Sequence, residues 1–380
     1  MRVLKSDQFG IAEEPSVGLR DQGMALSVLS GVRPGVVVVN DATAPTSLFV
    51  GAPEGGFAWG YLAGDPQDDW FRRELRVWLF AERGLGQNVV FSFLACDSIA
   101  WEDALAEILA PRAVIPDRRL HYECTTRPGD WREAVPDGYE IEDLDQAFLA
   151  SNVEVHPKVS EWMEANFGSV DGFLRHGVGA VGVHEGRVVS WILADSLVDG
   201  LCDIGGETEE AHQRKGLAHA ATCRTVELAL DRGVERVGWH CHVINLPSIR
   251  TAEKAGFELR YEYAVYPVQF DPEGHEKLVR IVAGEYAEAA GEALERKAYG
   301  EADALFTRML GFVGGPEADV AIGAARAAAG VGDPDRAFEF LDHAIRVGWN
   351  RAGQTRTRPE FESLQQDARW ERIMMKLDSA

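Results

Sequence analysis

Apolar and polar positions form short alternating runs over the first 126 residues, separated by glycine, proline and aspartate. Runs of β-branched and aromatic residues are typical of strands, and apolar residues three or four apart are typical of helices. The pattern predicts the order strand-strand-strand-helix-strand-helix-strand. The expected strands are Val36–Val39, Ser47–Val50, Phe57–Leu62, Asn88–Phe93 and Leu120–Thr125, and the expected helices are Asp69–Glu82 and Trp101–Leu109, after a short helix near Gln22–Leu29.

A similar pattern returns between residues 127 and 270. Strands are expected at Val178–His184 and Val188–Leu197, joined by a short hairpin. The stretch Leu201–Phe257 then predicts a strand, a glycine-containing turn, a helix, a strand and a short helix, and a last strand follows at Tyr261–Val268. The repeated order indicates an α/β (α+β) fold that the two stretches share; the alternative is that any α/β domain gives such an order.

The last third is rich in alanine and glutamate with helical spacing, which predicts an all-α domain from 276 to 380. The segment GDPDRAFEFLDHAIRVGW resembles a tetratricopeptide-repeat hairpin, with small Ala337 and Ala344 at the helix contact. Trp349, Phe361 and Trp370 are expected in its core. The expected helices are Leu278–Leu294, Glu301–Val313, Ala318–Ala329, Asp335–Val347 and Pro359–Leu377.

The formal net charge of −23 disfavours nucleic acid and acidic membranes as partners, and it favours a cationic small molecule. Five cysteines without a CxxC pair are not a disulfide framework or a zinc site and are typical of a reducing cytosol. The chain has no apolar run of membrane-spanning or signal-peptide length, so we expect a cytoplasmic protein.

The turn Gln213-Arg214-Lys215-Gly216-Leu217-Ala218 opens directly into a helix. A helix N-terminus offers free N–H groups and a positive dipole end, and Gly216 lets an anion approach the backbone. The alternative is an ordinary basic helix start. The corresponding loop of the first third, Gly64–Asp69, carries three aspartates that cap a helix but repel phosphate.

Two motifs together resemble the GNAT superfamily of acetyl-CoA-dependent N-acetyltransferases: QRKGLA, and NLPSIRTAEKAGF after the strand. The longer span is similar to two-lobed bacterial members. This resemblance implies two GNAT-like mixed sheets in tandem with flanking helices: a degenerate N-terminal GNAT-like lobe (1–126) and a catalytic lobe (127–270), which precede the helical domain. The resemblance implies acetyl-CoA as co-substrate. Its pantetheine would pair with Gly206, Glu207 and Thr208, its pyrophosphate would sit on the amides of Gln213, Arg214, Lys215, Gly216, Leu217 and Ala218, and Asn245 and Ser248 would lie near the thioester or pantetheine.

Acetyl transfer to an amine needs a base, because a lysine-like amine is protonated at neutral pH. Asp203 is the first candidate and Glu207 the second, and His240 or His242 can replace them. Alternation turns Cys241 away from both histidines, so no metal site is expected there.

The family often places a tyrosine where this chain has Ala252. The usual general acid is therefore missing. Ser248, Tyr261 and Tyr263 are the candidates to replace it, and the alternative is that the thiolate leaves unassisted.

The sequence thus predicts an N-acetyltransferase that acts on a primary amine of a cationic small molecule, such as an antibiotic-like or amino-sugar amine. One alternative is a non-catalytic CoA-binding regulatory or scaffold protein that holds a partner through its helical repeats. Another is a protein N-acetyltransferase. The helical domain is also expected to provide the contact with a protein partner or with a second copy of the chain.

Overall fold

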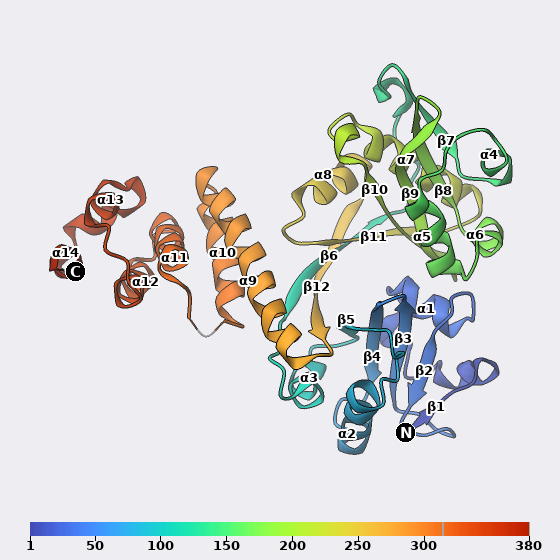
Figure 1. The fold of residues 1–380 in the computed structure, drawn as a ribbon, viewed down its shortest axis with the longest axis horizontal. Coiled ribbons are helices and arrows are strands. Elements are labelled where there is room, and N and C mark those ends of the chain that lie inside the picture. Colours follow the sequence, from blue (N-terminus) through green and yellow to red (C-terminus); the bar gives the residue numbers. More distant parts are fainter. Residues whose placement is uncertain (314, 380) are drawn as a thin grey trace. The chain divides into compact units, whose positions relative to one another are not determined.

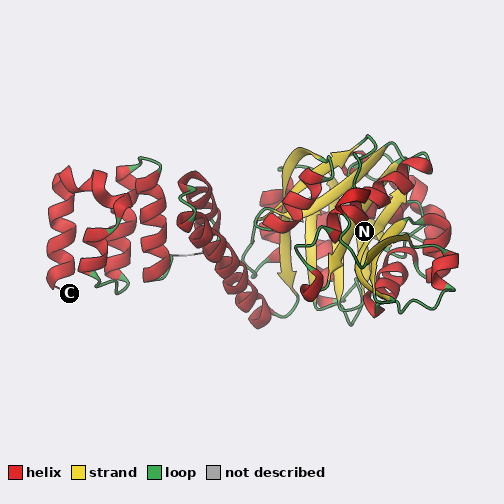
Figure 2. Ribbon diagram, turned by 90° about the horizontal axis from the view of Figure 1, so that it is seen from above, coloured by secondary structure: helices red, strands yellow, loops and turns green. Residues whose placement is uncertain are grey.

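A computed structural model describes residues 1–313 and 315–379. The chain divides into two compact units, Met1–Pro272 and Glu273–Ala380. The first unit is a large mixed sheet with helices on both faces, and the second is helical (Figure 2).

The sheet of the first unit has twelve strands in the order β1-β2-β3-β4-β5-β12-β6-β11-β10-β9-β8-β7. Two successive sets of six strands, β1–β6 and β7–β12, build it from its two edges inward. The strands are β1 (Arg2–Val3), β2 (Val36–Val39), β3 (Ser47–Glu54), β4 (Phe57–Gly64), β5 (Phe91–Cys96), β6 (Asp117–Cys124), β7 (Tyr139–Asp143), β8 (Gly179–His184), β9 (Arg187–Val198), β10 (Leu201–Thr208), β11 (Arg236–His242) and β12 (Glu258–Gln269).

The last strand of each set is exchanged with the other set. β12 pairs antiparallel with β5, and β6 pairs antiparallel with β11, so the two exchanged strands lie side by side at the centre (Figure 1). The two mixed sheets expected from the sequence are therefore joined into one continuous sheet. The boundary predicted at residue 126 stays a prediction.

Helices cover the sheet, and α7 follows directly from the turn that the sequence singled out. α2 ends at Arg76 and continues as a π-helical turn at Val77–Ala81, which together cover the single helix expected there. The helices of this unit are α1 (Gly23–Leu29), α2 (Asp69–Arg76), α3 (Trp101–Leu109), α4 (Gln146–Leu149), α5 (Pro157–Phe167), α6 (Val170–His176), α7 (Leu217–Asp231) and α8 (Leu246–Lys254).

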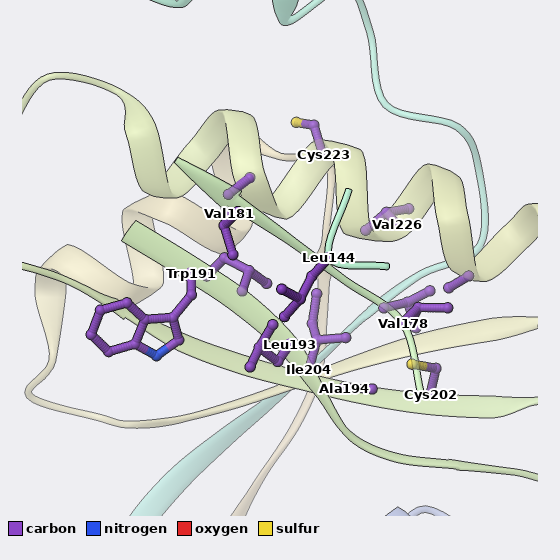
Figure 3. Close-up of a cluster of buried hydrophobic side chains, with 14 of the residues drawn as sticks. Leu144, Val178, Val181, Trp191, Leu193, Ala194, Cys202, Ile204, Cys223 and Val226 are labelled. Carbon is purple, nitrogen blue, oxygen red and sulfur yellow. The ribbon is translucent and has the colours of Figure 1, made fainter. Parts of the chain in front are cut away.

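Separate hydrophobic cores form around the two strand sets, and the exchanged strands complete them. Tyr122 and Cys124 of β6 belong to the core of the second set, while Tyr266 and Val268 of β12 belong to that of the first. Figure 3 shows the second core, in which side chains of β8, β9 and β10 pack beneath α7. Neither core is complete without a strand from the other set.

The second unit contains α9 (Pro272–Glu295, beginning at the unit boundary), α10 (Tyr299–Leu310), α11 (Ala318–Gly330), α12 (Pro334–Arg346), α13 (Ala352–Thr357) and α14 (Ala368–Ser379). Ala337 and Ala344 are buried where α12 packs on α11, and Trp349, Phe361 and Trp370 lie in the same core, as expected. The helix expected at 359–377 is divided into a 3-10 helix, Pro359–Gln366, and α14. No helix within the described residues is long and apolar enough to cross a membrane.

Candidate active site

The sheet opens between β10 and β11. These parallel strands pair only from Leu201 to Ile204, whereas β9 accompanies β10 as far as Thr208. Among the described residues, the stretch from Gly205 to Thr208 has no strand on the β11 side. The carbonyl oxygen of Thr208 accepts a hydrogen bond of 3.0 Å from Nε2 of Gln213, and the rest of this edge can pair with an extended ligand like an added strand.

Gly206 faces a tight backbone on the other side. A Cβ at this position would lie 1.9 Å from the carbonyl oxygen of Trp191, so only glycine fits. The open edge at Gly206 and Thr208 fits the narrow pantetheine arm that the sequence motifs imply. Both residues stay predicted contacts.

The basic turn before α7 has the geometry of an anion site. Gly216 stands at the N-cap with φ of 86° and no side-chain cap, and Arg214 also has a positive φ of 60°. The first-turn amides of a helix have no intrahelical partner. In the part of the chain that the structure describes, no backbone hydrogen bond of the loop uses the amides of Arg214, Lys215 or Gly216 as donors. This loop therefore fits the pyrophosphate of acetyl-CoA.

A cavity of about 380 Å³ adjoins the open edge. Both strand sets supply its walls, which combine carboxylates with aromatic rings. The lining includes Gln22, Met24, Glu54, Trp59 and Tyr61 from the first 126 residues, with Arg119 of β6, and Trp162, Asn166, Asp195, Asp203, Ile204, Gly205, Gly206, Trp239, His240, Cys241, His242, Asn245, Ser248 and Tyr263.

Asp203 is a buried residue that lines this cavity. Its Oδ2 accepts a hydrogen bond of 3.0 Å from the N–H of Gly23, while its Oδ1 lies 3.5 Å from Nε2 of His240. Burial alone would raise the pKa of Asp203, but the neighbouring His240, His121 and the Gly23 N–H lower it on balance. The first predicted base is therefore an ionised, buried carboxylate.

A β-bulge places a second carboxylate beside it. In the β9–β10 pairing, Asp203 faces Ser196 and Ile204 faces Ala194, so Asp195 is the extra residue. A Cβ on Gly205 would lie 3.0 Å from Oδ2 of Asp195, which puts this carboxylate over the start of the open edge. Burial, and secondarily the charge of Asp203, raises the pKa of Asp195 to about 7.

The ion pairs within the described residues include none for Asp195, whereas Glu54 is paired with buried Arg33 at 3.3 Å. A carboxylate without a cation in a partly buried site favours a positively charged ligand. Sequence reasoning missed Asp195, because a bulge depends on the register of two strands and leaves no motif.

Two other predicted catalytic residues lie in different places. Ser248 lines the cavity and its Oγ accepts a hydrogen bond of 3.0 Å from Nε1 of Trp239. Asn245 lies next to it and caps α8 through the N–H of Ser248. Glu207 is exposed, binds Nζ of Lys158 at 2.7 Å, and does not line the cavity.

Ala252 is fully buried in the core of the second strand set, so this helix offers no hydroxyl at the position where the family often has one. Of the two tyrosines proposed as substitutes, Tyr263 lines the cavity. Tyr261 instead stacks on His121 with ring centroids 4.9 Å apart. Within residues 1–313 and 315–379, no group of three or more His, Cys, Asp or Glu side chains is placed to hold a metal ion.

Comparison with known proteins gives one consistent result. The sequence model of the GNAT acetyltransferase family matches residues 17–266. The structure is similar to a GCN5-related N-acetyltransferase-like protein from Streptococcus suis 89/1591, with a TM-score of 0.52 and 25% identity, over 69% of this chain and 98% of that one. A GCN5-related N-acetyltransferase from Sphaerobacter thermophilus gives a TM-score of 0.48 at 14% identity, over 71% of this chain and 95% of that one.

Among curated proteins, an uncharacterized N-acetyltransferase of Bacillus subtilis (strain 168), YjdG, is 37% identical over 75 residues, or 20% of this chain. The match spans 45% of the length of that relative.

Proposed function

Because the chain belongs to the GNAT acetyltransferase family, we propose that it transfers an acetyl group from acetyl-CoA to a primary amine of a cationic small molecule. The observation that carries this proposal is the cavity beside the open edge of β10, lined by Asp195, which forms no ion pair among the described residues. The edge and the turn before α7 would hold the co-substrate, and the cavity would hold the amine.

The cavity fits a small acceptor. Its volume of about 380 Å³ lies at the lower end of the range for small-molecule sites. Trp59, Trp162 and Trp239 line it, and aromatic rings are suitable contacts for a cationic ligand. Asp195 then supplies the charge that fixes the ammonium end.

We assign the cofactor contacts as the motifs imply: the backbone of Gly206, Glu207 and Thr208 to the pantetheine, and the amides from Gln213 to Ala218 to the pyrophosphate. Asn245 and Ser248 would lie near the thioester. Asp203 remains a proposed proton acceptor, although its lowered pKa makes it a weak base. Glu207 is the weaker candidate, because it lies outside the cavity lining.

Isothermal titration calorimetry with acetyl-CoA tests the co-substrate site, and thiol release across a panel of mono- and polycationic amines tests the acceptor site. We expect binding and turnover, with cationic amines preferred over neutral ones of equal size. No acetyl-CoA binding by the folded protein would contradict the proposal.

Asp195 offers a second measurement. An ammonium group favours its ionised form, so a cationic acceptor that binds at pH 6 should release a proton from Asp195. Titration in two buffers of different ionisation enthalpy measures this release. Binding without proton release would exclude Asp195 as the cation contact.

The panel also separates the alternatives. Acetyl-CoA binding without transfer to any amine would support the regulatory or scaffold function, with the tetratricopeptide-like repeats holding a partner or a second copy of the chain. Faster acetylation of lysine peptides than of small amines would support a protein N-acetyltransferase.

A further inference from the structure

Four polar side chains form a continuous row across the three central strands. The hydroxyl of Tyr263 on β12 lies 2.9 Å from Nδ1 of His240 on β11. Nε2 of His240 lies 3.0 Å from Nδ1 of His121 on β6, and Nε2 of His121 lies 3.2 Å from Oε1 of Glu123. One end of the row lines the cavity, while His121 is fully buried.

The row has a defined direction of hydrogen bonding, set by Glu123. Burial raises the pKa of Glu123, but hydrogen bonds from His121 and Arg236 lower it on balance, so Glu123 is an anion. Burial, followed by the neighbouring His240, lowers the pKa of His121, so that ring is neutral. The carboxylate therefore takes the single N–H of His121 at Nε2, which leaves Nδ1 as an acceptor.

The tautomer of His121 in turn determines the tautomer of His240. With His121 Nδ1 as an acceptor, His240 donates from Nε2, and its Nδ1 carries a lone pair. The Tyr263 hydroxyl donates to that lone pair at the cavity wall. The ionised Glu123 thus holds His240 in the one tautomer that can accept a proton from the cavity side.

The strand exchange is what assembles this row. His121 and Glu123 belong to the first strand set, and their strand, β6, runs between β11 and β12 of the second. His121 faces His240 on one side and Tyr261 on the other in the strand register. A sheet with unexchanged last strands would not place His121 between these partners.

We propose that His240 is the proton acceptor of acetyl transfer, reached through Tyr263 and held in its tautomer by His121 and Glu123. This rests on the proposed function and puts His240 in the place of Asp203 as the proton acceptor. Tyr263 touches the substrate, whereas His121 and Glu123 are positioning residues that act through His240.

The protons balance as follows. The bound ammonium gives one proton to the oxygen of Tyr263, while the tyrosyl proton moves to Nδ1 of His240. The neutral amine then forms an N–C bond with the thioester carbonyl carbon, and the C–S bond breaks. The second N–H proton goes to the departing sulfur and yields the CoA thiol, and His240 returns its proton to solvent through the cavity.

The charged groups around His240 suit this role. The anion Asp203 lies 3.5 Å from its Nε2, and Asp195 of β9 lines the same cavity. Arg119 donates a hydrogen bond of 3.0 Å to the carbonyl oxygen of His240. His121 and Tyr263 complete the surroundings as neutral groups.

Steady-state kinetics of the full chain test the assignment. His240→Ala should lower kcat by about 100-fold or more, the usual effect of losing a general base, while acetyl-CoA binding by calorimetry stays within twofold. Because the ring borders the cavity, added imidazole should restore part of the lost kcat. Unchanged kcat in a folded His240→Ala protein would overturn the proposal.

Glu123→Gln tests the positioning role of Glu123 and leaves both histidine rings in place. The amide no longer fixes the His121 tautomer, so kcat should fall about tenfold with both KM values unchanged, and the acidic limb of the kcat profile should move. Glu258→Gln is the matched control, because Glu258 is exposed and shares Arg260 with Glu123. Equal effects of the two substitutions would overturn the positioning role.

Tyr263→Phe should lower kcat as well, because the phenyl ring cannot carry the proton. If the wild-type protein acetylates an amine but these variants retain its kcat and pH profile, the proton route fails and the proposed function stands. If the wild type binds no acetyl-CoA and acetylates nothing, the function fails and the route falls with it.

Discussion

Both strand sets contain a strand followed by a helix and a parallel strand. In the first set the two parallel strands stay paired for longer, and in the second set they separate early. β4 and β10 each begin opposite the first residue of the parallel strand that follows, at Phe57↔Phe91 and Leu201↔Arg236. The first pair stays together to Leu62, and the second opens after Ile204.

Asp97 closes the end of the first parallel pair, β4 and β5. It follows β5 directly, its N–H donates to the carbonyl oxygen of Leu62 at 2.9 Å, and its Oδ2 accepts from the N–H of Gly64 at 2.8 Å. Asp97 therefore hydrogen-bonds backbone groups at the end of the β4–β5 pair. In the β10–β11 pair an extended ligand would make the corresponding hydrogen bonds.

The N-termini of α2 and α7, the helices that follow β4 and β10, also differ. Asp68 caps α2 with its own side chain, which accepts from the N–H of Phe71 at 2.8 Å, whereas Gly216 leaves the start of α7 uncapped. The start of α2 thus carries its own anion, the carboxylate of Asp68, whereas the start of α7 takes its anion from a ligand. One fold thus gives a closed first half and an open second half, and we propose that the open half binds acetyl-CoA.

Gly216→Asp should have the largest effect, because it places a carboxylate at the N-cap of α7, as Asp68 does at the N-cap of α2. Repulsion of the pyrophosphate should weaken acetyl-CoA binding at least 100-fold, about 2.7 kcal/mol, measured by calorimetry. Gly233→Asp is the control: Gly233 also has a positive φ, 81°, but stands at the other end of α7. Equal loss in both variants would mean that strain, and not charge, is the cause.

Asp195→Asn should act next, through a pH-dependent gain in stability. The pKa of Asp195 is raised to about 7 in the folded chain, above its ordinary value, so the folded state loses stability as pH rises from about 4 to 7. Replacement should stabilise the protein by about 2 kcal/mol at pH 8 and by nothing at pH 4, measured by urea unfolding.

Asp199→Asn gives the comparison for that experiment, since Asp199 is an exposed residue after the same strand. It should change unfolding little at either pH. A gain from Asp195→Asn that is equal at both pH values would contradict the assigned burial of its charge.

Asp68→Ala should have the smallest effect and only on stability. Loss of the cap of α2 should cost about 1 kcal/mol in thermal unfolding, with acetyl-CoA affinity unchanged. Asp69→Ala, which removes only an exposed pair with Arg72, should cost less. Weaker acetyl-CoA binding by Asp68→Ala would show that the first strand set takes part in binding.

Local sequence predicted what local forces decide. The helix Trp101–Leu109 and the strand Val36–Val39 have the expected bounds, and the glycine turn leads into a helix as expected. These features depend on periodicity and caps within a few residues.

The exchange and the row of four side chains were not predicted. β6 and β12 are both suitable central strands, and nothing local says which set each will join. Asp195 depends on the register of a bulge, and His121 meets His240 only after the exchange. The missing part of the site is the part built from pairings between distant segments.

The exchange also governs how the chain can be made. On the ribosome, β5 emerges long before β12, its neighbour in the sheet, so one edge of β5 waits unpaired until the end of the second set has been synthesised. Strands that pair across so much intervening chain form slowly and are exposed to mispairing with other molecules. A nascent chain of this protein therefore needs protection at that edge from the synthesis of β5 until the synthesis of β12.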